Sequence, residues 1–176
     1  MTDSKTSELE RAKVIPDAEA ALVDGEPVMP QGQHVMVRRE FAFPGDVQSV
    51  AESREQVMQC VREYCQGEAE EIDLTLALQE ALANAALHGC GNDAGQTIHC
   101  VIEIGPGQIS CVVRDPGHGF NFARVADPAG FHATTLEHGR GIALMRAMVD
   151  ELSFAGGGSE VRFRKRMNCH AASPTG

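Results

Sequence analysis

The sequence contains no run of 18 or more apolar residues, which is about the length that a membrane-spanning helix needs. Residues 1–11 also lack the apolar stretch and the cleavage site of a signal peptide. Basic residues are few, since 15 Lys and Arg stand against 25 Asp and Glu and give a formal net charge of −10. A field of that sign repels phosphate, which argues against direct nucleic-acid binding and against binding to an anionic membrane. These absences together predict a cytoplasmic protein.

The six cysteines lack the context that would predict disulfides. Because no export signal places the chain in an oxidising compartment, we expect reduced thiols. A chain of 176 residues can bury one sizeable core, so it does not need covalent links for stability. Cys100 and Cys111 lie inside apolar runs, which indicates that both are small core residues.

Composition changes along the chain and predicts one folded domain between two tails. Residues 1–33 are rich in Ser, Asp, Glu, Lys and Pro and poor in large apolar side chains. Such a segment buries too little surface to offset its ordering entropy, so we expect a flexible N-terminal tail. Residues 34–166 carry regular hydrophobic periodicity and form the expected domain, and residues 167–176 are expected as a polar C-terminal tail.

Periodicity within the domain predicts helices and strands that are segregated instead of alternating. Apolar residues alternate from His34 to Phe43 as in a strand, and Asp46 has the side chain of a helix N-cap. The predicted elements are a strand over 34–43, helices over 46–67 and 70–87, a hairpin of strands 97–104 and 108–115, a long loop over 116–138, a helix over 141–152, and a last hairpin of strands 153–155 and 159–166. This order predicts an α+β two-layer sandwich with the helices on one face of a mixed, mostly antiparallel sheet.

Three polar residues recur every four positions on the second predicted helix, which is otherwise apolar. Glu80, Asn84 and His88 drift only about 40° per step around a helix of 3.6 residues per turn. A carboxylate and an amide in an apolar helix need polar partners, so we expect this line to face a polar site. A stripe that simply faces solvent is the alternative.

A glycine-rich turn follows the predicted strand that ends at Asp115. Alternation along that strand places Asp115 on the same side as Cys111 and Val113, where a carboxylate requires a hydrogen-bond donor. Gly117 and Gly119 then permit the backbone to approach a ligand closely. An ordinary turn at the end of a strand is the alternative.

A second glycine pair, Gly139 and Gly141 on either side of Arg140, precedes the third predicted helix. Unpaired N–H groups and the helix dipole make the N-terminus of a helix a physical anion site. This segment is therefore a candidate phosphate site, with a plain helix-start turn as the alternative.

Taken in this order, the three motifs resemble the nucleotide-binding fold shared by gyrase, the heat-shock chaperone of ninety kilodaltons, histidine kinases and mismatch-repair ATPases. In that fold, Glu-x3-Asn is the N box, Asp-x-Gly-x-Gly is the G1 box and Gly-x-Gly is the G2 box. The segments from Glu80 to Gly89 and from Gly139 to Met145 look most like those of the bacterial anti-sigma factor serine kinases of partner-switching systems. The resemblance covers residues 34–166, nearly the whole expected domain.

The resemblance implies a kinase that uses ATP and Mg²⁺. It gives Glu80 the role of catalytic base and Asn84 that of a Mg²⁺ ligand, which suits a hard cation that prefers oxygen. His88 would contact a phosphate or support the residues that do. Asp115 would accept a hydrogen bond from the adenine amino group.

For the rest of the nucleotide, the resemblance implies close backbone contacts. Gly117 and Gly119 would approach the base, and residues 116–138 would form a lid over the phosphates. Gly139, Arg140 and Gly141 would bring N–H groups and one cation to the phosphates.

The resemblance also implies protein partners. The substrate would be an antagonist of an anti-sigma factor, phosphorylated on a serine or threonine, and the kinase would also bind and inhibit a sigma factor. A homodimer is compatible with this reading. Three alternatives stay open at this point: a nucleotide-gated binding module without phosphoryl transfer, a structural α+β interaction protein, and metal binding through His88, Cys90, His99 and Cys100.

Removal of residues 1–33 should leave the melting temperature unchanged, because this segment has too few apolar groups to join a core. Thermal unfolding of the full chain and of residues 34–176 tests this expectation. A drop of more than about 4 °C, near 1 kcal/mol for a domain of this size, would show that the segment is docked.

Overall fold

The computed structural model describes residues 34–119 and 136–170. The predicted tail over 1–33, most of the predicted loop and the last six residues lie outside this part. Its elements are β1 (Val37–Gly45), a 3-10 turn (Val47–Ser49), α1 (Val50–Tyr64), β2 (Cys65–Gln66), α2 (Glu68–Asn84), a π-helical turn (Ala85–Gly89), β3 (Asp93–Gly105), β4 (Gln108–Arg114), α3 (Leu136–Met148), β5 (Glu151–Ala155), a second 3-10 turn (Gly156–Gly158), β6 (Glu160–Arg166) and β7 (Asn168–Cys169). None of the helices in this part is long and apolar enough to cross a membrane.

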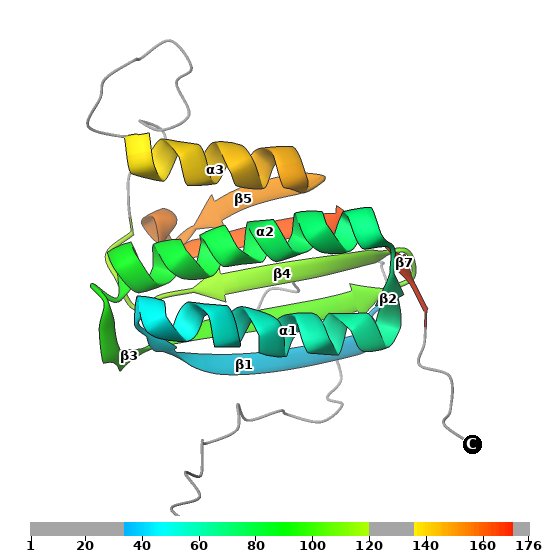
Figure 1. The fold of residues 1–176 in the computed structure, drawn as a ribbon, viewed down its shortest axis with the longest axis horizontal. Helices are drawn as coiled ribbons and strands as arrows, with labels where there is room; N and C mark the ends of the chain where they lie inside the picture. Colours follow the sequence, from blue (N-terminus) through cyan, green and yellow to red (C-terminus); the bar gives the residue numbers. More distant parts are fainter. Residues whose placement is uncertain (1–33, 120–135, 171–176) are drawn as a thin grey trace, which may run out of the picture.

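Five of the strands form one sheet, and α1, α2 and α3 lie side by side over one of its faces (Figure 1). The order of the strands is β1-β3-β4-β6-β5, and every pairing in it is antiparallel. Two helices separate β1 from β3, so the chain returns to the sheet in the opposite direction. The two-layer α+β sandwich is therefore confirmed, but the mixed character predicted for its sheet is wrong for the described strands.

The helices begin and end where short-range signals place them, with one exception. Asp46 caps the 3-10 turn that leads into α1, because its Oδ1 accepts a hydrogen bond from the Ser49 N–H at 3.0 Å. The second predicted helix continues through the π-helical turn to Gly89, close to the predicted end at residue 87. Gly91 there has a φ of 64°, the left-handed conformation that commonly follows a helix.

The core lies between α2 and the helix-facing side of the central strands. Helix α2 buries Leu74, Leu78 and Leu82, the apolar side opposite the predicted polar line. Cys100 of β3 and Cys111 of β4 are fully buried beneath it, which confirms their predicted place. Burial raises the pKa of the Cys100 thiol to about 12, so this side chain behaves as a small apolar residue.

The third helix differs from its prediction at both ends. It starts at Leu136 instead of residue 141 and ends at Met148, while Leu152 belongs to β5. Gly139 and Gly141 therefore lie inside α3. Glycine disfavours a helix by only about 1 kcal/mol, and packing of α3 against α2 outweighs that propensity.

Two expectations for the cysteines and the C-terminus are wrong. Cys65 and Cys169 form a disulfide across 104 residues of sequence. The predicted C-terminal tail starts too early, because Met167 is buried in the core and Asn168–Cys169 form β7, which pairs with β2. A disulfide forms between cysteines that the fold brings close together in space. Local composition does not reveal such a contact between residues so distant in the chain.

Lys165 joins three elements near the C-terminal end of α3. This side chain projects from β6, and its Nζ donates to Asp73 Oδ2 of α2 at 2.6 Å and to the Met148 carbonyl of α3 at 2.8 Å. The Lys165 side chain is only 14% exposed, so its two bonds are partly shielded from water.

Replacing Lys165 with Met should destabilise the fold by about 1 to 3 kcal/mol, because the Asp73 carboxylate and the Met148 carbonyl then lose a charged donor. Chemical denaturation of wild type and Lys165→Met measures the change. Arg62→Gln is the matched control, since Arg62 forms ion pairs with Glu55 and Glu71 on an exposed surface. An equal loss in both variants would contradict the role given to Lys165.

Candidate functional site

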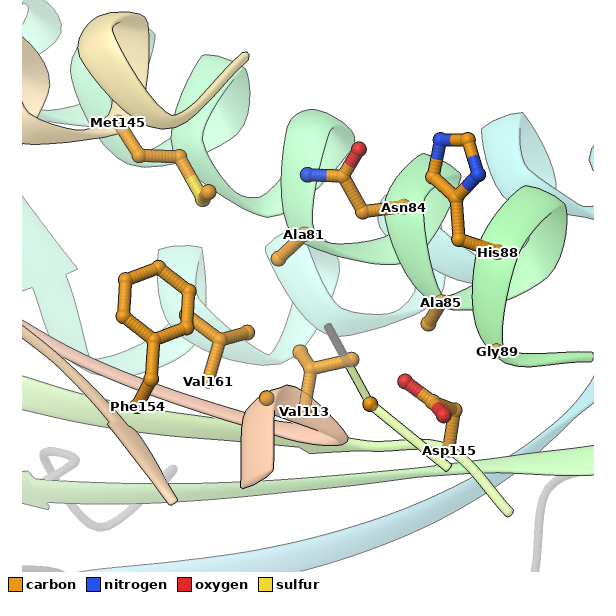
Figure 2. A pocket seen from close by; sticks show the side chains of 12 residues that line it. Ala81, Asn84, Ala85, His88, Gly89, Val113, Asp115, Met145, Phe154 and Val161 are labelled. Atoms are coloured by element: carbon orange, nitrogen blue, oxygen red, sulfur yellow. The ribbon is translucent and has the colours of Figure 1, made fainter. Parts of the chain in front are cut away.

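A pocket lies between the C-terminal half of α2, helix α3 and the strands β4, β5 and β6 (Figure 2). Its lining residues are Ala81, Asn84, Ala85, His88, Gly89, Val113, Asp115, Gly119, Met145, Phe154, Gly158 and Val161. Apolar walls with a few polar groups are typical of a small-molecule site. Four predicted site residues line it, namely Asn84, His88, Asp115 and Gly119.

Asp115 brings a carboxylate into this pocket directly after β4. Its side chain lies on the same side of the strand as Val113, as alternation predicts. The Asp115 Oδ1 accepts a hydrogen bond from the Gly117 N–H at 2.9 Å. Burial raises the pKa of Asp115 above its ordinary value, and the Gly117 N–H opposes that shift. The pocket therefore offers a ligand a partly desolvated hydrogen-bond acceptor.

The end of β4 is held firmly against β6 next to Asp115. The Asp115 N–H donates to the Ser159 carbonyl at 3.0 Å, and Arg114 Nε donates to Glu160 Oε2 at 2.7 Å. Burial alone would raise the pKa of Glu160, but the bonds from Arg114 and Arg162 outweigh it and lower that pKa. These contacts fix the position from which the Asp115 carboxylate enters the pocket.

Glycines surround Asp115 because the backbone comes too close for side chains. A Cβ built on Gly89 would lie 2.0 Å from the Asp115 Cγ, and one on Gly117 would lie 2.7 Å from the Gly89 carbonyl oxygen. Gly119 has a φ of 74°, and its Cβ would lie 2.3 Å from the Gly157 carbonyl oxygen. The predicted close approach of Gly117 and Gly119 is thus directed at the protein's own backbone in this structure.

Asn84 and His88 project from successive turns at the end of α2 (Figure 2). After Asn84 the helix widens into a π turn, in which the Cys90 N–H donates to the Ala85 carbonyl at 2.8 Å. A π turn rotates the residues that follow it relative to a regular α-helix, and such turns occur often at functional sites. Regular periodicity does not reveal this turn in the sequence.

Glu80 does not line the pocket but a neighbouring hollow between α2 and α3. The hollow is lined by Glu80, Arg140, Gly141 and Leu144. A Cβ on Gly141 would lie 2.7 Å from Glu80 Oε2 and 3.6 Å from Asn84 Nδ2. The lack of a side chain at Gly141 therefore permits the Glu80 carboxylate to lie against α3, one helical turn from Asn84.

The second glycine pair lies within the first turns of α3 instead of before the helix, because α3 begins at Leu136. The N–H groups of Arg140 and Gly141 therefore fall within the regular hydrogen-bonding pattern of a helix. The contact of these residues with a phosphate stays a prediction. Arg140 is exposed on α3 beside the hollow that contains Glu80.

Within residues 34–119 and 136–170, no three His, Cys, Asp or Glu side chains gather in a way that could hold a metal ion. The predicted alternative of a metal site through His88, Cys90, His99 and Cys100 therefore finds no support. The chemistry of the pocket lining suits a heterocyclic base, since its walls are apolar and Asp115 supplies an acceptor for an exocyclic amine.

A family model for the histidine kinase-like ATPase domain matches residues 43–165. The chain belongs to this family. The match spans the N-box helix, the strand that ends at Asp115 and helix α3, and it confirms the ATPase fold to which the three motifs pointed.

Among solved structures, the fold is similar to that of the RsbU and RsbW domains of Rv1364c from Mycobacterium tuberculosis. The two chains share 18% identity with a TM-score of 0.54, and the similarity covers 86% of this chain but only 36% of the other. No curated protein matches the sequence.

Several pocket residues were missed by the motifs. Met145 and Phe154 contribute apolar walls from α3 and β5, and Gly158 comes from the turn before β6. Gly89 falls within the segment that carries the resemblance but received no role there, whereas the structure places it in close contact with Asp115. Such residues carry no local pattern, because their place depends on how the two layers pack.

Asp115→Asn should lower the affinity for ATP by roughly 10- to 150-fold, since a charged hydrogen bond of about 1.5 to 3 kcal/mol is lost and the amide presents a donor where adenine presents one. Without nucleotide, the variant should melt at the same temperature as wild type or higher. The pKa of Asp115 is raised in the folded protein, so the ionised carboxylate destabilises the fold. This loss of stability develops as the pH rises from the unfolded pKa of 3.8 through the higher native pKa.

Calorimetric titration with ATP and thermal unfolding without it test the two halves of this expectation. Equal ATP affinity in wild type and Asp115→Asn would contradict the predicted hydrogen bond between Asp115 and the adenine amino group. A large loss of stability without ligand would instead show that the carboxylate is a structural group.

Proposed function

We propose that this protein is an ATP-dependent serine/threonine kinase whose substrate is an antagonist of an anti-sigma factor. The observation that carries the proposal is the position of Glu80, a carboxylate one helical turn from Asn84 that lies against Gly141 in a hollow beside the pocket. A module that only binds a nucleotide has no need of a base there. The similarity to a chain named for RsbU and RsbW domains supports a place in a partner-switching system.

In this proposal, the pocket holds ATP. Asp115 accepts a hydrogen bond from the adenine amino group, and Val113, Met145 and Phe154 bury the base. Asn84 and His88 lie toward the phosphates, and Arg140 supplies a cation on α3. Bound Mg²⁺ would neutralise phosphate charge, with the amide oxygen of Asn84 as its protein ligand.

The chemistry assigned to Glu80 is that of a general base. It would accept the proton of the substrate hydroxyl as that oxygen forms a bond to the γ-phosphorus and the bond to the ADP oxygen breaks. In this proposal the hydroxyl would reach Glu80 through the hollow between α2 and α3, apart from the pocket that would hold adenine.

The partners follow from this chemistry. The phosphorylated protein would be the antagonist, and the kinase would hold a sigma factor when the antagonist is absent. ATP is a cytoplasmic metabolite, so we place the protein in the cytoplasm. A homodimer stays a prediction.

A nucleotide-gated binding module is the second candidate, and one observation favours it. Gly139 and Gly141 lie within the first turns of α3, where the Gly141 N–H falls within the helical hydrogen-bonding pattern instead of facing a phosphate. A protein that binds nucleotide and partner without transfer needs Asn84 and Asp115 but not Glu80.

Glu80→Ala should leave ATP affinity within a few-fold of wild type and slow phosphoryl transfer by about 10² to 10⁴, the usual contribution of a positioned base. Asn84→Ala should impair both, because loss of a Mg²⁺ ligand loosens the phosphates before transfer. The measurements are ATP titration and single-turnover phosphorylation of the same antagonist protein.

Glu52→Ala provides the control, since Glu52 is an exposed carboxylate on α1. Transfer at the wild-type rate by Glu80→Ala would make Glu80 a structural residue. If wild type binds ATP but phosphorylates no antagonist domain, the binding module becomes the better account.

A further inference from the structure

The C-terminal strand β7 is attached at the end of α2 that lies away from the pocket (Figure 1). It pairs with β2, which connects α1 to α2, and the Cys65–Cys169 disulfide joins the two strands. Around this bond, the His170 N–H donates to the Tyr64 carbonyl at 2.9 Å, and the Met167 N–H donates to the Gly107 carbonyl at 3.1 Å.

Without the disulfide, the hydrogen bonds of the β2-β7 ladder would hold this strand only weakly. The β2-β7 ladder contains two residue pairs, fewer than a strand pair needs to be stable by itself in water. Loss of the covalent link would leave the ladder to compete with the entropy of a chain end. We therefore expect the state of the two sulfur atoms to govern how firmly β7 is held beside the buried Met167.

We propose that Cys65 and Cys169 form a reversible redox clasp that docks the C-terminal strand when oxidised and releases it when reduced. The reaction partner is a small disulfide of the glutathione type. One protein thiolate attacks this disulfide, forms a mixed disulfide and expels one small thiol. The second protein thiolate then attacks the protein sulfur of the mixed disulfide and expels the other, so the protein loses two electrons and the small disulfide gains them.

The geometry favours this pair over the other cysteines. Cys100 and Cys111 are fully buried within the sheet, and burial raises the pKa of both thiols, which suppresses their reactive thiolate form. Burial also raises the pKa of Cys90, and it raises that of Cys60 on α1 to about 11. Cys65 and Cys169 are 5% and 7% exposed, and opening of the short ladder exposes them to a small reagent.

The clasp and the pocket lie at opposite ends of α2. Cys65 lies three residues before Glu68, the first residue of this helix, whereas Asn84 is its last residue. Release of β7 should therefore change the stability of the domain and the exposure of its C-terminal strand, but leave nucleotide affinity within about two-fold. This inference does not depend on the kinase reaction.

The first experiment equilibrates the full-length protein in buffers of oxidised and reduced glutathione. Free thiols are counted after denaturation, and the crosslinked peptides are identified by mass spectrometry. We expect four of the six thiols to remain in the oxidised protein and all six to return in reduced glutathione. Six thiols under both conditions, or a bond that reduced glutathione does not open in the native protein, would overturn the clasp.

The second experiment compares thermal unfolding and hydrogen exchange in the two states. The oxidised protein should melt about 5 to 15 °C higher, since the link closes a loop of about 100 residues. The His170 amide should exchange slowly when oxidised and much faster when reduced. Cys65→Ser and Cys169→Ser should behave as the reduced form in both buffers, whereas Cys60→Ser should respond like wild type. Equal melting and equal exchange in both buffers would contradict the proposal.

Discussion

The partly buried carboxylate of Asp115 is the constraint around which the pocket is arranged. Its position requires the end of β4 to be fastened to Ser159, and it requires Gly89 to come close without a side chain. An ionised group in an apolar pocket costs free energy until a hydrogen-bond donor meets it. The raised pKa of Asp115 expresses that cost. Ionisable groups with shifted pKa values are common at functional sites, where a bound ligand can supply the missing hydrogen-bond donor.

Helix α2 relates this pocket to the neighbouring hollow. It is the middle helix of the layer, and the π turn that follows Asn84 contributes Ala85, His88 and Gly89 to the pocket. One turn earlier, Glu80 faces α3, where only a glycine at position 141 leaves room for its carboxylate. One helix thus serves two adjoining cavities, and in the proposed reaction the nucleotide and the second reactant would not compete for the same opening.

Features that depend on local sequence were predictable, and features that depend on packing were not. Alternation placed Asp115 beside Val113, Asp46 caps its turn as expected, and the N-box helix has its apolar side in the core. The π turn, the partners of Gly89 and the Cys65–Cys169 bond arise from tertiary contacts, for which the sequence holds no periodic signal. The start of α3 was predicted too late in the chain because Gly139 and Gly141 were read as lying before the helix, whereas packing outweighs their low helix propensity.

The contacts of α3 make its two ends unequal. Its last carbonyl, from Met148, is held by Lys165, which in turn is paired with Asp73 of α2. Toward its beginning, Gly139 and Gly141 each cost about 1 kcal/mol of helix stability relative to alanine. Shortening this helix from its N-terminal end, beside Glu80, would therefore cost less free energy than shortening it from its C-terminal end, where the Lys165 contacts would be lost.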